Sequence, residues 1–508
     1  MTLRIVPFLV AVLTVAACDK GDDSAGGGES DADTDTDTDS DTDSDTDTDT
    51  DTDTDSDTDT DTDTDTDTFI DATIDLSDAD AKLLGEQDGD QAGLGVAGVG
   101  DTDGDGMDDV LIGARWNGVA AFGAGSAYLV CGPVTGTSDL SSATARIRGE
   151  ESTDAAGIGV AGAGDVDADG NDDMLVSGHV NGEGGPAAGA AYLLLAPVTG
   201  ELSLADADAK FVGEAGNDVA GFAVAGAGDV DDDGHADLLI GAPYNDAGAE
   251  DAGAAYLLRG PVTGTLDLSS ADAKLVGETV AGFAGLSVSG AGDVNADGVE
   301  DLLVGAPYAG TTYLVDGSVD GTFALTGADA TFLAEVVTDL TGRSVSKAGD
   351  IDSDGHDDLI IGGPGAVGGA GAAYVVLGPV SGIRELVKAD AILVGSPDDG
   401  AGVSVSNAGD VNKDGHDDML IGAYISDVAV GDAGAAYLVL GPVSGTVPLS
   451  KAAARFYGEE PFDQAGIGVA GAGDLDGDGR ADLLIGSVFN SGGGYQAGAA
   501  YVMYGGSL

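Results

Sequence analysis

The chain has 508 residues and a formal net charge of −75 at pH 7, and 87 of its residues are Gly. This Gly content, with 43% hydrophobic and 5% aromatic residues, favours many short strands joined by tight turns over long helices. The hydrophobic fraction is too high for a wholly disordered chain. The acidic excess argues against nucleic acid and anionic membrane surfaces as partners, because phosphates would be repelled, and it favours cation binding.

The beginning of the chain has the pattern of an export signal. Arg4 precedes an apolar run over residues 5–13, which is too short to span a bilayer as a permanent helix. Residues 15–18, with the sequence Val-Ala-Ala-Cys, resemble the lipobox of bacterial lipoproteins. The resemblance implies that residues 1–17 are a signal peptide and that lipid on Cys18 anchors the protein to the bacterial cell envelope. The outer membrane, the cell surface and the periplasmic side all stay open as its location, and an ordinary secretory signal is the alternative.

Cys131 is the only other cysteine. Acylation of Cys18 would leave it without an intramolecular partner, which is unusual for an exported protein. Because Cys131 follows the apolar residues 127–130, we expect it to lie in a buried strand and to be unreactive. The fold then needs another stabiliser, and bound metal is the candidate.

An Asp- and Thr-rich segment follows the predicted signal. From residue 31 to residue 68 every odd position is Asp, which gives 19 carboxylates alternating mainly with Thr and Ser. With no apolar surface to bury and strong mutual repulsion, residues 18–68 are expected to form a disordered, extended linker. A tandem calcium site is the alternative, but even spacing without Gly turns defines no fixed cage.

After this segment the sequence repeats, and the repeat decides the fold class. The segment Asp-x-(Asp/Asn)-x-Asp-Gly-x-x-Asp occurs seven times, and its copies begin 57 to 64 residues apart. Four apolar segments, named here strands A to D, accompany each copy. In the third repeat they are residues 220–225, 238–241, 254–258 and 273–278. Four short strands in each repeat, with Gly-rich turns between them, are typical of a propeller blade.

The arrangement of the strands also predicts how the ring closes. The last repeat has strands A to C but no strand D after them, whereas a spare strand D, residues 81–86, precedes the first repeat. Pairing of this N-terminal strand with the last blade would leave no free sheet edge. We therefore predict an all-β fold, a seven-bladed β-propeller with four-stranded blades, over residues 69–508.

The seven acidic loops lie between strands A and B and have the pattern of calcium sites. Calcium takes six to eight oxygen ligands, and loop positions 1, 3, 5 and 9 carry side-chain oxygens in every copy. Position 6 is always Gly, which permits a sharp turn at positive φ. Position 7 varies freely, as expected if only its carbonyl is used. One such loop could be an ordinary Asp-Gly turn, but seven copies with the same acidic positions indicate metal sites.

We predict up to seven Ca²⁺ ions as cofactors, held through these positions. Because position 3 is Asn in the fourth and sixth loops, those two sites should bind more weakly. The predicted ligands, loop by loop, are Asp101, Asp103, Asp105 and Asp109; Asp165, Asp167, Asp169 and Asp173; Asp229, Asp231, Asp233 and Asp237; Asp293, Asn295, Asp297 and Asp301; Asp350, Asp352, Asp354 and Asp358; Asp410, Asn412, Asp414 and Asp418; and Asp474, Asp476, Asp478 and Asp482.

The unit that spans strands A and B resembles the FG-GAP repeat of integrin α propellers. Gly-Ala-Pro at residues 241–243 and 305–307 matches the second half of that repeat. The Phe-Gly half is degraded, since Phe222 and Phe283 are each followed by Ala. The resemblance covers nearly all of residues 70–508 and implies a propeller with calcium in the A–B loops of its lower face. It also implies that ligands bind on the opposite, upper face, which carries the B–C and D–A loops.

The B–C loops differ in length between repeats while the rest of the repeat is nearly constant, so we expect these loops to carry the binding function. Trp116, Tyr244, Tyr308 and Tyr424 are the ligand-binding candidates there, because exposed aromatic rings stack on sugars or anchor a protein partner. The alternative is that the three tyrosines wedge between blades. Another Tyr recurs in strand C of every blade, and we expect it to pack in the core.

Catalysis has little support in the sequence. His179 is the only His outside the acidic loops, and the sequence has no catalytic-triad order, phosphate-binding loop or zinc motif. We therefore predict a binding or adhesion module for a protein partner, not an enzyme. A carbohydrate-binding, lectin-like propeller is the alternative, and a purely structural envelope protein is a third hypothesis.

Overall fold

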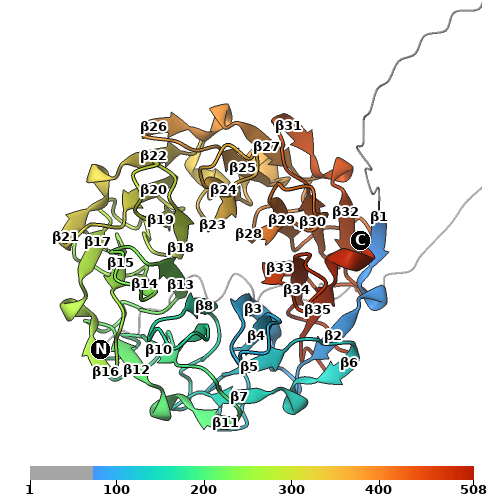
Figure 1. Ribbon diagram of the computed structural model, residues 1–508, viewed down its shortest axis with the longest axis horizontal. Helices are drawn as coiled ribbons and strands as arrows, with labels where there is room; N and C mark the ends of the chain where they lie inside the picture. The colour runs from blue at the N-terminus through green and yellow to red at the C-terminus, as the bar shows by residue number, and fades with distance from the viewer. Residues whose placement is uncertain (1–71) are drawn as a thin grey trace, which may run out of the picture. The chain divides into compact units, whose positions relative to one another are not determined.

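The computed structural model describes residues 72–508, and the predicted signal peptide, Cys18 and the predicted linker lie outside the described residues. Seven β-sheets surround a common axis (Figure 1), and the described part of the chain contains no α-helix. The predicted all-β, seven-bladed propeller is confirmed.

Strand A of each blade lies nearest the axis (Figure 1), and five of the seven strands A contain at least two Gly. Neighbouring strands A approach so closely that a Cβ added at Gly98 would lie 2.5 Å from the carbonyl oxygen of Gly471. At Gly98 only Gly permits such an approach of two backbones, whereas Lys347 and Asn407 occupy the equivalent position in the fifth and sixth blades. The seven strands A are β3 (Ala92–Gly100), β8 (Val160–Gly164), β13 (Ala223–Gly228), β18 (Ser287–Gly292), β23 (Ser344–Gly349), β28 (Val405–Gly409) and β33 (Ala465–Gly473).

Strands B and C form the apolar middle of each blade, and they are almost fully buried because each sheet packs between two others. The recurrent Tyr of strand C is at most 8% exposed, so it packs in the core as expected. Strands B are β4 (Asp109–Ala114), β9 (Asp173–Ser177), β14 (Asp237–Ala242), β19 (Asp301–Ala306), β24 (Asp358–Gly363), β29 (Asp418–Ala423) and β34 (Asp482–Ser487). Strands C are β5 (Ser126–Cys131), β10 (Ala190–Leu194), β15 (Ala254–Leu258), β20 (Thr311–Asp316), β25 (Ala372–Val376), β30 (Ala435–Val439) and β35 (Ala499–Met503).

Strand D completes the four-stranded blade, and a fifth strand, which the sequence analysis missed, extends it. The chain between strands C and D runs to the preceding blade and pairs in parallel with that blade's strand D, as β11 does with β7. Strands D are β7 (Ala145–Arg148), β12 (Ala209–Val212), β17 (Ala273–Val276), β22 (Ala330–Leu333), β27 (Ala391–Val394), β32 (Ala454–Tyr457) and β2 (Ala81–Leu84). The fifth strands are β11 (Gly200–Ser203), β16 (Gly264–Asp267), β21 (Gly321–Ala324), β26 (Gly382–Glu385), β31 (Gly445–Pro448), β1 (Ala72–Asp75) and β6 (Gly136–Asp139).

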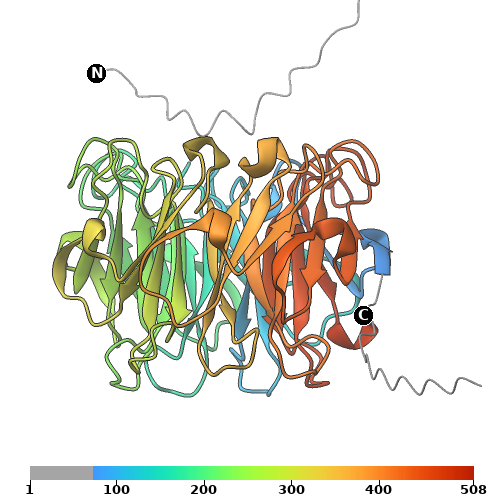
Figure 2. The same ribbon diagram turned by 90° about the horizontal axis from the view of Figure 1, so that it is seen from above.

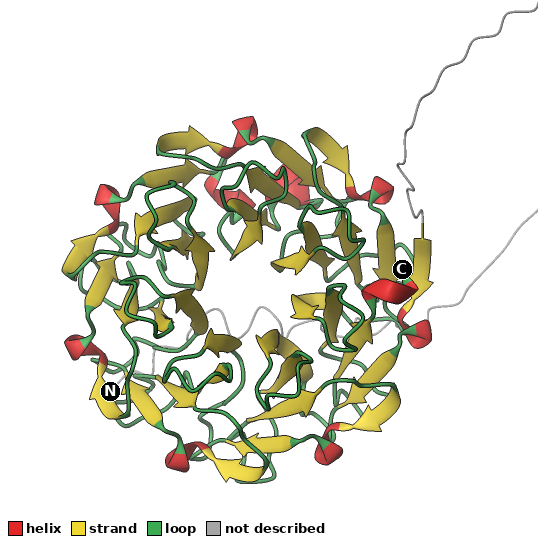
Figure 3. Ribbon diagram, in the orientation of Figure 1, coloured by secondary structure: helices red, strands yellow, loops and turns green. Residues whose placement is uncertain are grey.

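A short 3-10 helix follows each fifth strand at the outer edge of the ring (Figure 3). Each begins with a Leu that is at most 1% exposed, so the connection is held to the core by one apolar side chain. These helices are η2 (Leu76–Asp78), η3 (Leu140–Ser142), η4 (Leu204–Asp206), η5 (Leu268–Ser270), η6 (Leu325–Gly327), η9 (Leu386–Lys388) and η10 (Leu449–Lys451). The others are η7 (Val337–Asp339), η8 (Ala366–Gly369) and η11 (Gly505–Ser507).

The N-terminal end of the described chain closes the ring at two places. β2 pairs antiparallel with β35 and is strand D of the last blade, as predicted. β1 pairs in parallel with β32 and is the fifth strand of the sixth blade, which the sequence analysis did not foresee. In every other repeat, the chain after strand C supplies first a fifth strand and then strand D. Residues 72–84 supply these same two strands, β1 and β2, where the ring closes.

Alternating strand directions separate the loops into two faces, seen at opposite sides of the ring in Figure 2. The A–B loops form the lower face, and the B–C and D–A loops form the upper face. The turns η7 and η8 belong to the upper face. Among the described residues, no helix is long and apolar enough to cross a membrane.

The closing strand is expected to contribute as much stability as an internal strand D. Leu83 in β2 and Leu275 in β17 occupy equivalent positions and are at most 1% exposed. Leu83→Ala and Leu275→Ala should each lower the free energy of unfolding by about 2–5 kcal/mol, because each leaves a cavity in the core. Urea unfolding measures both losses. A loss at Leu83 far below the loss at Leu275 would contradict the closure described here.

Candidate functional site

The acidic loops are tight coils held by their own carboxylates. In the first loop the Asp101 carboxylate accepts N–H bonds from Gly104 at 2.7 Å and from Gly106 at 2.9 Å. The Asp105 carboxylate accepts the N–H of Met107 at 2.9 Å. The same bonds from positions 6 and 7 recur in all seven loops. The N–H donors therefore fold each loop around its first and fifth positions.

The structure brings part of the predicted ligand set together in five of the seven loops. In four of them the carboxylates of positions 1, 3 and 9 offer oxygens within 4.8 Å of one another, and in the first loop those of positions 1, 3 and 5 do. The fourth and sixth loops, whose position 3 is Asn, contain no such group among the described residues. The groups are Asp101, Asp103 and Asp105; Asp165, Asp167 and Asp173; Asp229, Asp231 and Asp237; Asp350, Asp352 and Asp358; and Asp474, Asp476 and Asp482. The remaining position-5 carboxylates are exposed or nearly so and lie outside these groups.

The position-9 Asp has a structural role that the sequence did not indicate. In the second blade Asp173 is fully buried, and it accepts the N–H of Val166 at 2.9 Å and the N–H of Ala196 at 2.8 Å. It thereby joins the loop to the chain that leaves strand C. Burial raises the pKa of this Asp in several blades, to about 6 at Asp237 and about 7 at Asp482. A bound cation would offset the cost of charging such a group.

In four of the seven loops the position-8 carboxylate joins the loop to its neighbour around the lower face. The Asp172 carboxylate accepts the N–H of Asp101 in the preceding blade at 3.2 Å. Asp108, Asp357 and Asp417 bond in the same way to position 1 of the preceding loop, at 2.7 to 3.1 Å. The sequence analysis assigned this position no function, and the partner could not be inferred because it belongs to another repeat.

The donor set of these loops fits a hard divalent cation such as calcium. Every predicted side-chain ligand is an oxygen, and the five groups hold three carboxylates within a few ångströms. Oδ1 of Asp352 and Oδ1 of Asp474 are buried and have no hydrogen-bond partner among the described residues. A buried carboxylate oxygen without a partner is costly, and a cation would satisfy it.

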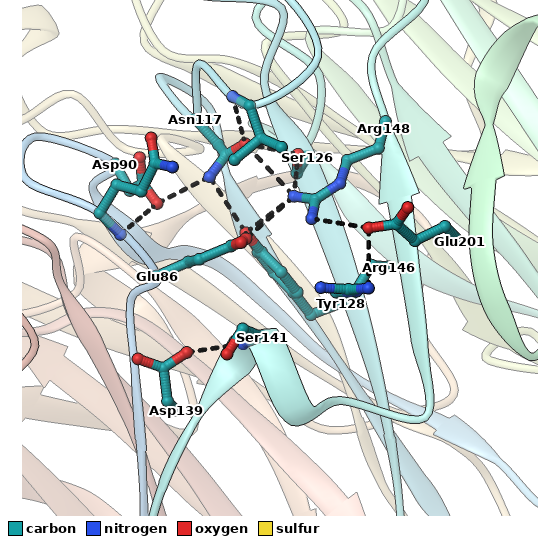
Figure 4. Close-up of polar contacts among 12 residues, drawn as sticks. Glu86, Asp90, Asn117, Ser126, Tyr128, Asp139, Ser141, Arg146, Arg148 and Glu201 are labelled. Atoms are coloured by element: carbon teal, nitrogen blue, oxygen red, sulfur yellow. Dashed lines mark hydrogen bonds and ion pairs between the residues drawn. The ribbon is translucent and has the colours of Figure 1, made fainter.

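On the upper face, polar networks join neighbouring blades (Figure 4). Tyr128 donates its hydroxyl hydrogen to Glu86 at 2.9 Å, and Arg148 pairs with the same carboxylate at 3.0 Å. Asn117 donates to Tyr128 at 3.2 Å and to Asp90 at 2.7 Å. Equivalent Glu–cation pairs occur in three more blades: Lys210 with Glu150, Lys274 with Glu214, and Lys82 with Glu459.

Two of the four aromatic candidates, Tyr244 and Tyr308, pack against a further aromatic ring. Phe283 forms edge-on contacts with Tyr244, at a centroid distance of 4.9 Å, and with Tyr308, at 5.0 Å. Tyr424 is half-buried in the sixth blade. Trp116 is half-buried in the first blade and lies 5.8 Å from the guanidinium of Arg115. The structure therefore joins Tyr244 and Tyr308 in one cluster around Phe283.

Two groups outside the acidic loops could take part in proton or thiol chemistry. His179 is 3% exposed and packs edge-on against Phe222. Burial, with the charge of Arg115 nearby, lowers the pKa of His179 to about 4. Cys131 ends β5 and is half-buried, and burial raises the pKa of its thiol to about 12. Both groups are therefore neutral at pH 7, and the thiol is not activated.

Exposed apolar side chains gather on the upper face. Among the described residues, twelve large hydrophobic side chains are the most exposed; ten of them lie in B–C or D–A loops, and Ile383 and Val387 lie at the outer edge. The ten are Val119, Phe122, Val280, Val336, Val337, Val367, Val428, Val430, Phe462 and Tyr495. Apolar groups gathered on one face indicate an interaction surface, which the sequence did not reveal beyond the aromatic candidates.

Four segments of the chain match the family model described as the FG-GAP repeat: residues 220–258, 284–322, 341–376 and 465–503. Each segment runs from the beginning of strand A to strand C and so contains one acidic loop. The chain therefore carries FG-GAP repeats, as the resemblance implied.

The curated relatives that the chain matches include several integrin α subunits. It is 33% identical to integrin alpha-5 of Xenopus laevis over 218 residues, which are 40% of this chain and 20% of that protein. It is 33% identical to integrin alpha-4 of Xenopus laevis and 34% identical to integrin alpha-IIb of Homo sapiens, each over 30% of this chain and 16% of that protein. The matches thus span a fifth or less of the length of these relatives.

Gly is expected to be required at position 6 of each loop because the backbone there has a positive φ, and not because a side chain would clash with neighbouring atoms. Gly106 has φ +88°, and a Cβ added there would meet no atom within 4 Å. Gly106→Ala should therefore lower the free energy of unfolding by about 1–2 kcal/mol, the cost of a left-handed L-residue. Gly118→Ala is the control, because Gly118 is exposed and its φ lies outside the left-handed region. Equal unfolding midpoints for the two variants would contradict this explanation.

Proposed function

We propose that this chain, which carries FG-GAP repeats and is similar to integrin α subunits, is a calcium-binding module that docks a protein partner on its upper face. The chain would be divided into a signal peptide, residues 1–17, a linker, residues 18–68, and the propeller from residue 69. Lipid on Cys18 would anchor the exported protein to the bacterial cell envelope. In this proposal the protein is a binding module and not an enzyme.

The exposed apolar residues of the upper face are the observation that carries the docking proposal. Leaving ten large hydrophobic side chains in water has a cost that a partner would remove by covering them. An interaction surface requires exposed apolar side chains to be concentrated on one part of the molecule. These ten residues all lie on the upper face, and none lies on the lower face. The similarity to integrin α subunits supports a protein partner over a sugar, and no observation on the described residues favours a sugar.

The calcium part of the proposal is supported by the charge of the lower face. Five of the seven loops hold groups of three carboxylates, and position-8 carboxylates add further negative charge between neighbouring loops. Like charges at such separations repel each other unless a cation is present. Calcium accepts this many oxygen ligands and the irregular geometry of a loop, whereas magnesium requires stricter octahedral geometry.

Calcium is expected to stabilise the propeller, and Asn295→Asp should increase that effect. The Asn295 side chain donates to Asp301 at 3.1 Å, so the variant loses a bond and gains a repulsion without calcium. With calcium the variant replaces the neutral amide oxygen of position 3 by a charged carboxylate ligand. The melting temperature should therefore fall in chelator and rise more steeply with calcium than in the wild type. Asn171→Asp, a position-7 change of equal charge, should not steepen the response; an unchanged melting temperature in calcium and chelator would sink the calcium proposal.

Capture of partners tests the docking face directly. The calcium-loaded protein would be used to capture proteins from the cell envelope, beside a Val336→Ser, Val337→Ser double variant. The control is Ile383→Ser with Val387→Ser, which removes two exposed apolar groups, 76% and 49% exposed, from the outer edge. A protein retained by the wild type and the control but lost from the first variant supports the proposal. Equal capture by all three would overturn the upper-face assignment, and retention of glycans alone would favour a lectin.

A further inference from the structure

Position 8 of the acidic loops links some neighbouring loops and leaves others unlinked. At four of the seven boundaries a carboxylate at this position accepts the N–H of position 1 in the preceding loop; these residues are Asp108, Asp172, Asp357 and Asp417. The links join the seventh, first and second loops in one run and the fourth, fifth and sixth loops in another. The third loop belongs to neither run, because its own position 8 is Ala236 and Glu300 of the fourth loop makes no hydrogen bond to it among the described residues.

The link between the first and second loops connects two candidate metal groups through one residue. Asp172 makes two bonds with Asp101: its N–H donates to the Asp101 carbonyl at 3.1 Å, and its carboxylate accepts the Asp101 N–H at 3.2 Å. The Asp101 carboxylate belongs to the group of the first loop. Asp173, which directly follows Asp172, belongs to the group of the second loop. Asp172 therefore fixes the relative position of ligands that belong to two different loops.

The end of strand A leaves room for this link. The Asp172 carboxylate lies so close to Gly100 that a Cβ added at Gly100 would overlap it. In the third loop the Cβ of Ala236 lies in the corresponding place beside Gly164, and the Ala236 N–H donates to the Asp165 carbonyl at 2.9 Å. The two boundaries therefore share the backbone bond and differ in the carboxylate.

We propose that Asp172 and its three counterparts are positioning residues through which neighbouring calcium sites bind cooperatively. Asp101, once fixed by a cation in the first loop, holds Asp172 and therefore Asp173 in place for the second loop. The second ion then binds at a smaller cost in conformational entropy, which is positive cooperativity. The coupling should be strongest in the run of the seventh, first and second loops, because each of the three has a group of three carboxylates. The inference rests on the proposed calcium binding.

The position-6 glycines give a separate readout for each loop of the full chain. The N–H groups of Gly106, Gly170 and Gly234 donate to the position-1 carboxylates of the first three loops at 2.8 to 2.9 Å. Because those carboxylates belong to the candidate metal groups, the NMR shifts of these amides report calcium in each loop separately. A calcium titration of the chain labelled with ¹⁵N-glycine therefore measures an affinity for each loop.

A change in the first loop tests the link to the second. Asp103→Ala with Asp105→Asn removes two exposed carboxylates from the first loop and leaves Asp101 unchanged. It should weaken calcium binding at the second loop about fivefold or more and leave the third loop unchanged. In an Asp172→Ala background, which has the residue that two other loops carry at position 8, it should not affect the second loop. A general effect of lost charge would persist in that background. Glu300→Ala, the matched control, should preserve the coupling.

The reverse experiment creates a link where the chain has none. In an Ala236→Asp background, Asp167→Ala with Asp169→Asn in the second loop should weaken calcium binding at the third loop, which the same change should not do in the wild type. A second loop indifferent to the first-loop change, or an effect that persists in Asp172→Ala, would overturn the inference. So would a third loop that responds equally with and without Ala236→Asp. Amides that respond to calcium independently would leave the calcium proposal standing without the coupling, whereas amides that do not respond would remove both.

Discussion

Backbone pairing across the boundary between blades is the constraint on which the rest of the ring depends. The parallel pair of β11 with β7 and its six counterparts mean that no sheet is made from one repeat alone. Main-chain hydrogen bonds thus join each repeat to the next whatever side chains it carries. Because a closed ring has no first blade, the beginning of the propeller has to supply what the last repeats lack. The two pairings of residues 72–84 meet that requirement.

The two faces stabilise these boundaries with opposite chemistry. On the lower face, carboxylates are held by backbone N–H donors of the same loop and of the next blade, as between Asp172 and Asp101. Such donors orient a negative charge but do not neutralise it. On the upper face Arg148 neutralises Glu86, and lysines neutralise the equivalent Glu in three other blades. The need for external cations is therefore concentrated on the lower face.

Most of the fold could be predicted because four of the five strands in a sheet are apolar and buried. Residues 254–258 were predicted as a strand and form β15 with the same bounds, and β2 closes the ring as predicted. The fifth strands were missed because they are exposed and polar, as in β6, and their partner lies in another repeat. The candidate site divides in the same way. The regular spacing of the acidic residues predicted positions 1, 3, 5 and 9 of the loops. Position 8 is Ala in two loops and Glu in one, so the sequence shows no recurrent residue there that would predict its bond to a neighbouring blade.

The side chains of the upper face can vary because the strands and the acidic loops of the lower face hold the ring together. Thr331 and Ile392 stand in the fourth and fifth blades at the strand-D position where three other blades have the Lys that pairs with Glu. Blades with and without the polar network thus share one framework of strands and acidic loops. A side chain such as Tyr495, 70% exposed above this framework, adds nothing to the core, and its exposure has a cost in water. Exposure of that kind, concentrated on the upper face, is consistent with selection for a bound state, because the ring would be at least as stable without the exposed apolar side chains.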